Sequence, residues 1–320
     1  MKITKMHNNK NTDRYTEVTN KIITALENNI KPWVQPWDGG VQTSPMRYNN
    51  KPYQGINTLI LWIEAAEKQY NAAYWMTFKQ AKLLGGNIRK GERASAIFYS
   101  GTMKSMAGEE EITEEATTRQ QENIKIDEIH ATSEQQYKKF MKSYYVFNVT
   151  QIDKLPEKYY AKSKEARTNN TLEQSPALEE FIKNTQAIIN YGGISACYRE
   201  NNDYIQMPEM QLFKTSNAYY ATLFHELTHW TKHKNRLNRN LGGKRFGDNN
   251  YAMEELVAEL GAAFISSALG ITPDIREDHA PYIANWLKAL KSDKRAIFTA
   301  ATLAQSATNY LLELNNATNK

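Results

Sequence analysis

Hydrophobic residues recur at helical spacing near the start of the chain, which predicts an amphipathic helix opening after Thr12 or Asp13. The residues that carry this spacing are Val18, Ile22, Leu26 and Ile30. The segment TFKQAKLLGG, residues 77–86, begins with the Thr77/Gln80 capping-box pattern and closes on glycine, so it predicts a short helix. NIRKGERASAIFYS (87–100) predicts two strands around a Lys-Gly turn, and SYYVFNVTQI (143–152) predicts a further strand.

The second half of the chain has a mainly helical pattern. Pro176, with Ser175 as cap, suits the first turn of a helix. ISACYRENNDYIQM (194–207) predicts a β-hairpin that turns at residues 200–203. Further helices are expected over 216–234, 251–269 and 280–316, the last with a break near Ser292. These patterns together predict an α+β protein of two domains, with mixed α/β structure in the first and a small sheet among helices in the second.

Two polar stretches divide the chain. Residues 104–136 are acidic and lack aromatic residues, which is typical of an exposed excursion from a domain. Residues 157–175 form a polar linker, so we expect one domain over 12–156 and another over 176–320. The single cysteine, Cys197, excludes an internal disulfide framework. The sequence has no secretion signal and no run of eighteen apolar residues, so we expect a cytoplasmic protein without a membrane partner.

The net charge of +5 is unevenly distributed. Residues 1–103 carry 14 lysines and arginines against 7 aspartates and glutamates, whereas residues 104–136 carry 3 against 9. A basic N-terminal half suits a polyanionic partner. A protein that acts by mimicking DNA would be acidic throughout, so DNA mimicry is excluded.

The segment ATLFHELTHWTKH, residues 221–233, contains an H-E-x-x-H pattern. On a helix, His225 and His229 lie one turn apart on one face, where both imidazoles can bind one ion, and Glu226 points toward the same site. A catalytic zinc ion takes three protein ligands and keeps a position open for water. The pattern therefore predicts a zinc site, or a site for another divalent metal such as Mn²⁺, provided that a third ligand exists.

YAMEELVAELGAAF, residues 251–264, supplies that ligand. Glu255 and Glu259 are four residues apart beside an apolar stripe, and carboxylates in such a place need a partner for their charge. We assign Glu255 as the third ligand and Glu259 to the far N–H of a ligand histidine. His233 lies a further turn along the helix, out of reach of the ion. The metzincin spacing also fails, because it needs glycine and histidine at the positions of Lys232 and Asn235.

This arrangement predicts metal-dependent hydrolysis of an amide, most naturally a peptide. Glu226 is the expected general base. His279 is the first candidate to stabilise the oxyanion, and three tyrosines are alternatives: Tyr204, Tyr219 and Tyr251. The predicted strand over 204–207 is expected to pair with an extended substrate by edge addition.

A surface for single-stranded DNA needs cationic side chains and aromatic faces on which bases stack. The aromatic candidates are Trp33, Trp37, Tyr53 and Trp75. The cationic candidates are Lys51, Lys79, Arg89, Lys90 and Arg93, of which Arg89 and Lys90 flank a predicted turn. A second basic stretch, KHKNRLNRNLGGKRFG (232–247), follows the histidine helix and suits either a DNA-facing surface or an ordinary solvated loop.

Several of these segments resemble a known family. LFHELTHWTKHKNRLNR, YAMEELVAELGAAF and HAPYIANWLKALKSDKRAIFTAA are similar to the C-terminal zincin-like domain of ArdC-type antirestriction proteins, which occur on conjugative plasmids and related mobile elements. NIKPWVQPWDGG, GINTLILW, YWMTFKQAKLLGGNIRKGE and VFNVTQIDKLP resemble the N-terminal domain of that family, which binds single-stranded DNA and also occurs in some plasmid primases. The likeness covers nearly the whole chain except the extreme N-terminus and the acidic stretch.

The resemblance implies a gluzincin-type metallopeptidase centre held by His225, His229 and Glu255, and protection of incoming DNA from restriction. It does not supply a role for the acidic stretch or for Cys197. Two alternatives stay open: a non-proteolytic protein that coats single-stranded DNA and has a structural or vestigial metal site, and a protease that acts on DNA-bound proteins. The expected partners are single-stranded DNA and an unidentified protein substrate, restriction-related or DNA-bound.

Overall fold

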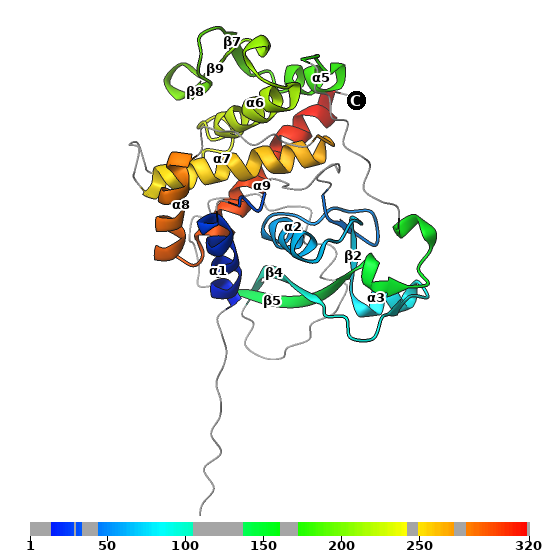
Figure 1. Cartoon of the computed structure of the whole chain (residues 1–320). Coiled ribbons are helices and arrows are strands. Elements are labelled where there is room, and N and C mark those ends of the chain that lie inside the picture. Colours follow the sequence, from blue (N-terminus) through cyan, green and yellow to red (C-terminus); the bar gives the residue numbers. More distant parts are fainter. Residues whose placement is uncertain are drawn as a thin grey trace, which may run out of the picture. The chain divides into compact units, whose positions relative to one another are not determined.

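The computed structural model describes residues 14–28, 30–33, 44–104, 137–160, 172–241, 249–271 and 280–318 (Figure 1). The chain forms two compact units, one made of residues 1–95 with 145–320 and the other of residues 96–144. Helices make up most of the described chain and the sheets are small, which confirms the predicted α+β class. None of the described helices is long and apolar enough to cross a membrane.

The N-terminal part of the first unit alternates helices with short strands. Its elements are α1 (Arg14–Glu27), β1 (Met46–Arg47), α2 (Ile56–Lys68), β2 (Tyr74–Met76), α3 (Phe78–Leu83), β3 (Asn87–Ile88) and β6 (Ile152–Asp153). The strand β5 (Tyr137–Asn148) begins in the second unit and ends in this one. The strands β1, β2 and β5 are neighbours in one sheet, and the second unit holds β4 (Ser95–Lys104) beside β5. The predicted capping box at Thr77 and Gln80 is present at the start of α3.

The two strands predicted around the Lys-Gly turn are confirmed, but they do not pair with each other. Both strands exist, but β3 pairs antiparallel with β6, while β4 lies next to β5. Arg89 continues the β3–β6 ladder, because its backbone N–H donates to the carbonyl of Gln151 at 3.0 Å. Gly91 takes a positive φ of 89°, which suits glycine, but the turn leads away from β3 into another sheet. The pattern identified the strands, and tertiary pairing decided their partners.

The C-terminal part of the first unit contains a three-stranded sheet and five helices among its described residues. These are α5 (Pro176–Asn184), β7 (Ile188–Tyr191), β8 (Cys197–Arg199), β9 (Tyr204–Met207), α6 (Ser216–Trp230), α7 (Asn249–Ala268), α8 (Ala280–Ser292) and α9 (Ala296–Thr318). The predicted hairpin is confirmed as β8 and β9, and the predicted break is confirmed at Ser292. The sheet order β7-β9-β8 makes β9 the central strand, so the expectation that residues 204–207 offer a free edge is wrong.

Helix α7 packs against α6, α8 and α9 and so lies at the centre of the helical core (Figure 1). It is buried along most of its length, because apolar residues follow one another on nearly all of its faces. Gly261 lets α6 approach closely: a Cβ at this position would lie 2.5 Å from Cγ2 of Thr228. The charged side chains that α7 does carry therefore face α6 in a dry environment, where they need partners.

Candidate metal centre

Helix α6 carries both histidines of the H-E-x-x-H pattern. The Thr215 hydroxyl accepts a hydrogen bond from the backbone N–H of Ala218 and caps the start of the helix. His225 and His229 lie one turn apart, and both are buried, since the core encloses most of α6. A buried imidazole pair needs polar partners, and α7 supplies them.

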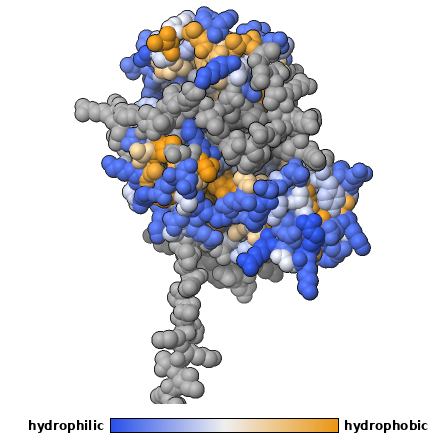
Figure 2. All heavy atoms as spheres, viewed as in Figure 1, coloured by the Kyte–Doolittle hydropathy of each residue, from blue (hydrophilic) through white to orange (hydrophobic). Residues whose placement is uncertain are grey.

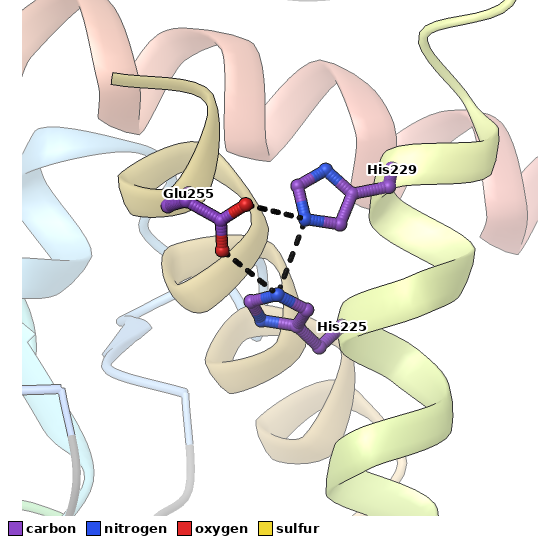
Figure 3. A group of neighbouring side chains, drawn as sticks. All are labelled: His225, His229 and Glu255. Carbon is purple, nitrogen blue, oxygen red and sulfur yellow. Dashed lines mark hydrogen bonds and ion pairs between the residues drawn. The ribbon is translucent and has the colours of Figure 1, made fainter. Parts of the chain in front are cut away.

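Glu255 of α7 faces both imidazole rings (Figure 3). The Nε2 atoms of His225 and His229 are 3.2 Å apart, and the carboxylate oxygens of Glu255 lie 3.5 Å from the first and 3.6 Å from the second. Ligand atoms held tetrahedrally at zinc-ligand distances are about 3.3–3.4 Å from one another. These three side chains therefore have the donor types and the spacing that a small divalent cation requires.

The far nitrogen of each histidine has its own carboxylate. Nδ1 of His229 lies 3.1 Å from Oε1 of Glu254, and Nδ1 of His225 lies 3.2 Å from Oε1 of Glu259. A carboxylate beside Nδ1 favours the tautomer with the proton on Nδ1, which leaves the Nε2 lone pair for a metal. Glu259 thus lies at the far nitrogen of His225, and Glu254, which the sequence analysis did not single out, lies at the far nitrogen of His229.

Arg239 holds Glu254 in place and was missed by the sequence reasoning. Its guanidinium donates to both oxygens of Glu254, each at 2.9 Å, and also to the backbone carbonyl of Thr228 at 2.9 Å. Burial raises the pKa of Glu254, but the hydrogen bonds from His229 and Arg239 outweigh it and lower the pKa to about 2. The sequence signal was weak: an arginine in a basic loop, and a third glutamate beside an apolar stripe.

The glutamates of α7 also control the charge of the metal-free site. Burial lowers the pKa of His229, but Glu255 and Glu254 overcome it and raise the pKa to about 10. Burial raises the pKa of Glu255, and the two histidines lower it well below its ordinary value. Without a metal, the glutamates therefore favour the protonated form of His229, and a cation that binds there must displace this proton.

Glu226 lies beside these ligands but takes a different partner. Its Oε2 accepts a hydrogen bond from the backbone N–H of Tyr198, at 2.8 Å. Tyr198 is the middle residue of β8, an edge strand of the sheet β7-β9-β8. The carboxylate of Glu226 is therefore anchored on this edge strand, and it is not one of the three grouped ligand residues.

A half-buried ion pair joins β8 and β9 to the end of α6. The Arg236 guanidinium forms a bidentate pair with Asp203, donates to the Tyr198 hydroxyl at 3.1 Å and lies 3.8 Å from the ring centre of Trp230. Hydrogen bonds from Arg236 are the main reason why the pKa of Asp203 is lowered. Neither alternative for this loop, a DNA-facing surface or an ordinary solvated loop, describes Arg236 and Arg239, because their guanidinium groups pair with Asp203 and Glu254.

Tyr251 is the tyrosine of the predicted oxyanion candidates that lies next to a ligand. It precedes Glu255 by one helical turn, and its hydroxyl is 3.5 Å from that of Tyr282. Burial, Tyr282 and Glu255 raise the pKa of Tyr251, so it stays a neutral donor. Tyr219 points its hydroxyl at Tyr191 instead, at 3.4 Å. His279, the first candidate, lies outside the described residues.

The residues assigned to DNA contact fall into two groups. The described aromatic residues are buried: Trp33 and Trp75 are each 1% exposed and Tyr53 is 6% exposed. A buried ring offers no face to a base, so this part of the assignment is wrong. The cationic residues are exposed: Lys51, Lys79, Arg89, Lys90 and Arg93. Trp37 lies outside the described residues.

Two protein-family models match the chain. A model of zincin-like metallopeptidases matches residues 176–303, and a model of the N-terminal domain of anti-restriction factor ArdC matches residues 12–147. The uncharacterized protein y4eC of Sinorhizobium fredii is 37% identical over 303 residues, which cover 94% of this chain and 92% of that protein. DNA primase TraC of Escherichia coli is 34% identical over 299 residues, and this match spans only 19% of the primase.

Solved structures agree with this relationship. The metal-free crystal structure of antirestriction protein ArdC from plasmid R388 is 40% identical, with a TM-score of 0.77. The Mn(II)-bound structure of the same protein is 39% identical, with a TM-score of 0.73. Each match covers 95% of this chain and 98% of the solved chain. The chain belongs to the family of ArdC-type antirestriction proteins.

Proposed function

We propose that this protein protects the DNA of a mobile element from restriction and carries a metal-dependent peptidase-type centre. The observation that carries the catalytic part is the spacing of His225, His229 and Glu255. The Nε2 atoms of the two histidines are 3.2 Å apart, and one oxygen of Glu255 lies 3.5 Å from the first while its other oxygen lies 3.6 Å from the second. The Nδ1 atom of each histidine faces a carboxylate, which is the usual arrangement for histidines that bind a metal. The antirestriction part rests on the ArdC relatives.

The residues of the centre divide the chemistry between them. A divalent cation bound there supplies a Lewis acid that activates water and polarises a carbonyl group. Glu226 is the proposed general base, because its carboxylate lies outside the ligand set and is held by one neutral donor, the Tyr198 N–H. The proton that it accepts passes to the leaving amine. Tyr251 is the proposed hydrogen-bond donor to the developing oxyanion, in addition to the metal.

Zinc is the proposed cation, and manganese is the alternative. The histidine and carboxylate ligands suit both ions, the zincin-like model favours zinc, and the R388 relative was crystallised with Mn(II). Metal analysis of the purified protein measures the occupancy. We expect one equivalent in the parent protein and loss of most of it in Glu255→Ala. Equal metal content in both proteins would contradict the ligand assignment.

The Glu226→Gln variant separates a peptidase from a non-proteolytic coat protein. We expect it to keep the metal, since Glu226 is not a ligand, and to lose hydrolysis of a casein or peptide-library substrate by at least about 100-fold, as expected when a general base is removed. The restriction of incoming DNA is measured in parallel. Unchanged antirestriction together with no proteolysis by the parent protein would favour the coat protein. Cleavage confined to DNA-bound proteins would favour a protease that acts on such complexes.

We also propose that the N-terminal part binds single-stranded DNA through what we call the α3 surface. It consists of the exposed residues Phe78, Lys79, Lys82, Leu83, Arg89 and Lys90. Phe78 is 54% exposed and Leu83 79%, and Figure 2 shows apolar residues among hydrophilic ones over this part of the molecule. An exposed ring among cationic side chains is what sequence-tolerant binding of single strands requires. This surface takes the role that the sequence reasoning gave to the buried tryptophans.

Charge reversal tests the α3 surface. The double variant Lys79→Glu/Lys90→Glu should weaken binding of a fluorescent oligonucleotide by about tenfold or more at low salt and reduce the salt dependence by about two counterions. Phe78→Ala should weaken binding at all salt concentrations, because stacking contributes about 1–3 kcal/mol per base. The matched control is Lys183→Glu/Lys288→Glu, which reverses two exposed charges on α5 and α8. Equal losses in both double variants would indicate a general charge effect and contradict the proposed surface.

A further inference from the structure

The N-terminal half of the chain contributes a side chain to the surroundings of the metal centre. Nε1 of Trp33 donates to Oε2 of Glu259 at 3.4 Å, and Oε1 of the same carboxylate lies 3.2 Å from Nδ1 of His225. We propose that Trp33 is a positioning residue for the metal centre: it orients Glu259, and through it the ligand His225. This inference rests on the proposed metal site, and it makes the affinity of the C-terminal centre for its cation depend on the N-terminal half.

The packing around Trp33 restricts where its N–H can point. The indole is 1% exposed and meets the ring of Trp286 edge-on, with the ring centres 5.7 Å apart. Trp286 is stacked on Tyr282, which in turn is stacked on Tyr251, one helical turn before Glu255. A ring enclosed in this way has few rotamers available, so its N–H is a fixed donor.

The chain on both sides of Trp33 is tied to the C-terminal helices. The Thr19 hydroxyl of α1 donates to the carbonyl of Lys294 at 2.8 Å, and α1 packs against α8. After Trp33, the hydroxyls of Ser44 and Ser267 are 3.0 Å apart, and Ser267 belongs to α7. Contacts on both sides of Trp33 in the sequence therefore join the N-terminal part of this unit to its C-terminal helical part.

A fixed donor on Glu259 changes how this carboxylate serves His225. Glu259 is buried, so each of its oxygens needs a partner. With Oε2 held by Trp33, Oε1 stays turned to the imidazole, which fixes the ring plane and the tautomer. Without the indole N–H, Oε2 loses this donor and the carboxylate is held less firmly against Nδ1 of His225, so the Nε2 of His225 is less well directed at the cation.

The variant Trp33→Phe removes the N–H and keeps an aromatic ring against Trp286. Trp62→Phe is the matched control, because Trp62 is also a buried tryptophan of the N-terminal half, and it contacts α7 through Phe264, with ring centres 5.7 Å apart. Zinc affinity is measured by competition with a chromogenic chelator, and the thermal unfolding of the metal-free proteins is recorded alongside. We expect a zinc Kd about 3- to 10-fold higher in Trp33→Phe and within about twofold of the parent in Trp62→Phe.

A double-mutant cycle with Glu259→Ala identifies the route. If Trp33 acts through Glu259, the Trp33→Phe change should have no further effect on the zinc Kd in the Glu259→Ala background. The visible spectrum of the cobalt(II)-loaded protein should also change in Trp33→Phe and not in Trp62→Phe, since it reports the ligand arrangement. An unaltered Kd in Trp33→Phe, equal losses in both tryptophan variants, or additive effects in the cycle would overturn the inference. A parent protein that binds no divalent metal would instead refute the metal site itself.

Discussion

Replacing Gly261 by alanine tests whether the close approach of α6 and α7 sets the metal centre. A Cβ at residue 261 would lie 2.5 Å from Cγ2 and 2.6 Å from Oγ1 of Thr228, a fully buried residue. Thr228 directly precedes the ligand His229, and Gly261 lies two residues after Glu259. Widening the gap at this contact therefore moves the imidazoles of α6 away from the carboxylates of α7.

Two opposing effects decide the sign of the stability change. In an unconstrained helix, alanine in place of glycine stabilises by about 1 kcal/mol through helix propensity. Thr228 is β-branched and donates to the carbonyl of Phe224 at 2.8 Å, so rotation of its side chain exchanges one short contact for another. Overpacking of a rigid core costs about 1–3 kcal/mol. We expect a net loss of about 1–2 kcal/mol in the free energy of unfolding, and a zinc Kd about tenfold higher because ligands and carboxylates separate.

Urea unfolding of the metal-free protein and chelator competition measure the two quantities. The double variant Gly261→Ala/Thr228→Ala is the control, because it removes both short contacts and leaves only the Thr228 Cβ position at 3.1 Å. We expect it to recover part of the lost metal affinity. A Gly261→Ala protein that is more stable than the parent and binds zinc equally well would show that the helices separate freely, and would refute the reasoning.

Two further predictions concern Glu254. Arg239→Met leaves this buried carboxylate without its guanidinium, so we expect a loss of about 3–5 kcal/mol in the free energy of unfolding, measured by urea titration; a loss below about 1 kcal/mol would contradict the role of Arg239. The pKa of Glu254 is lowered from 4.5 to about 2. The ionised carboxylate of Glu254 therefore stabilises the folded protein above pH 4.5. This contribution to the free energy of unfolding is at most about 3 kcal/mol and is lost as the pH falls toward 2. The free energy of unfolding of the metal-free Glu254→Gln variant should not show this loss between pH 4.5 and pH 2. An identical pH dependence in both proteins would contradict the prediction.

The helices and the histidine pair of the candidate metal site were accessible from the sequence because their signals are local. The one-turn spacing of His225 and His229 follows from helix geometry alone, and α5 to α9 lie close to their predicted ranges. The approach of Glu255 to these histidines depends in addition on the packing of α7 against α6. Helix α1 ends at Glu27, and Ile30, which continues the apolar spacing, is exposed beyond it. Periodicity therefore located the element, and its end depended on contacts that periodicity does not report.

The partners of charged and aromatic residues were less accessible because they depend on tertiary structure. Trp33 and Trp75 stand among lysines in the sequence, but their large apolar area places them in the core. Arg236 and Arg239 looked like a solvated basic loop until the fold brought Asp203 and Glu254 to them. A charge count cannot separate a surface arginine from one that holds a buried carboxylate, since the two differ only in their spatial neighbours.

All three carboxylates that serve the two histidines, Glu254, Glu255 and Glu259, project from the same helix, α7. Turning α7 about its own axis would withdraw them together, so no arrangement serves one imidazole and neglects the other. The centre should accordingly assemble in a single cooperative step when α6 and α7 dock. A partial unfolding event that frees α7 would remove one ligand and both outer carboxylates at once and leave only the two imidazoles of α6, so the affinity for a cation should fall in one stage.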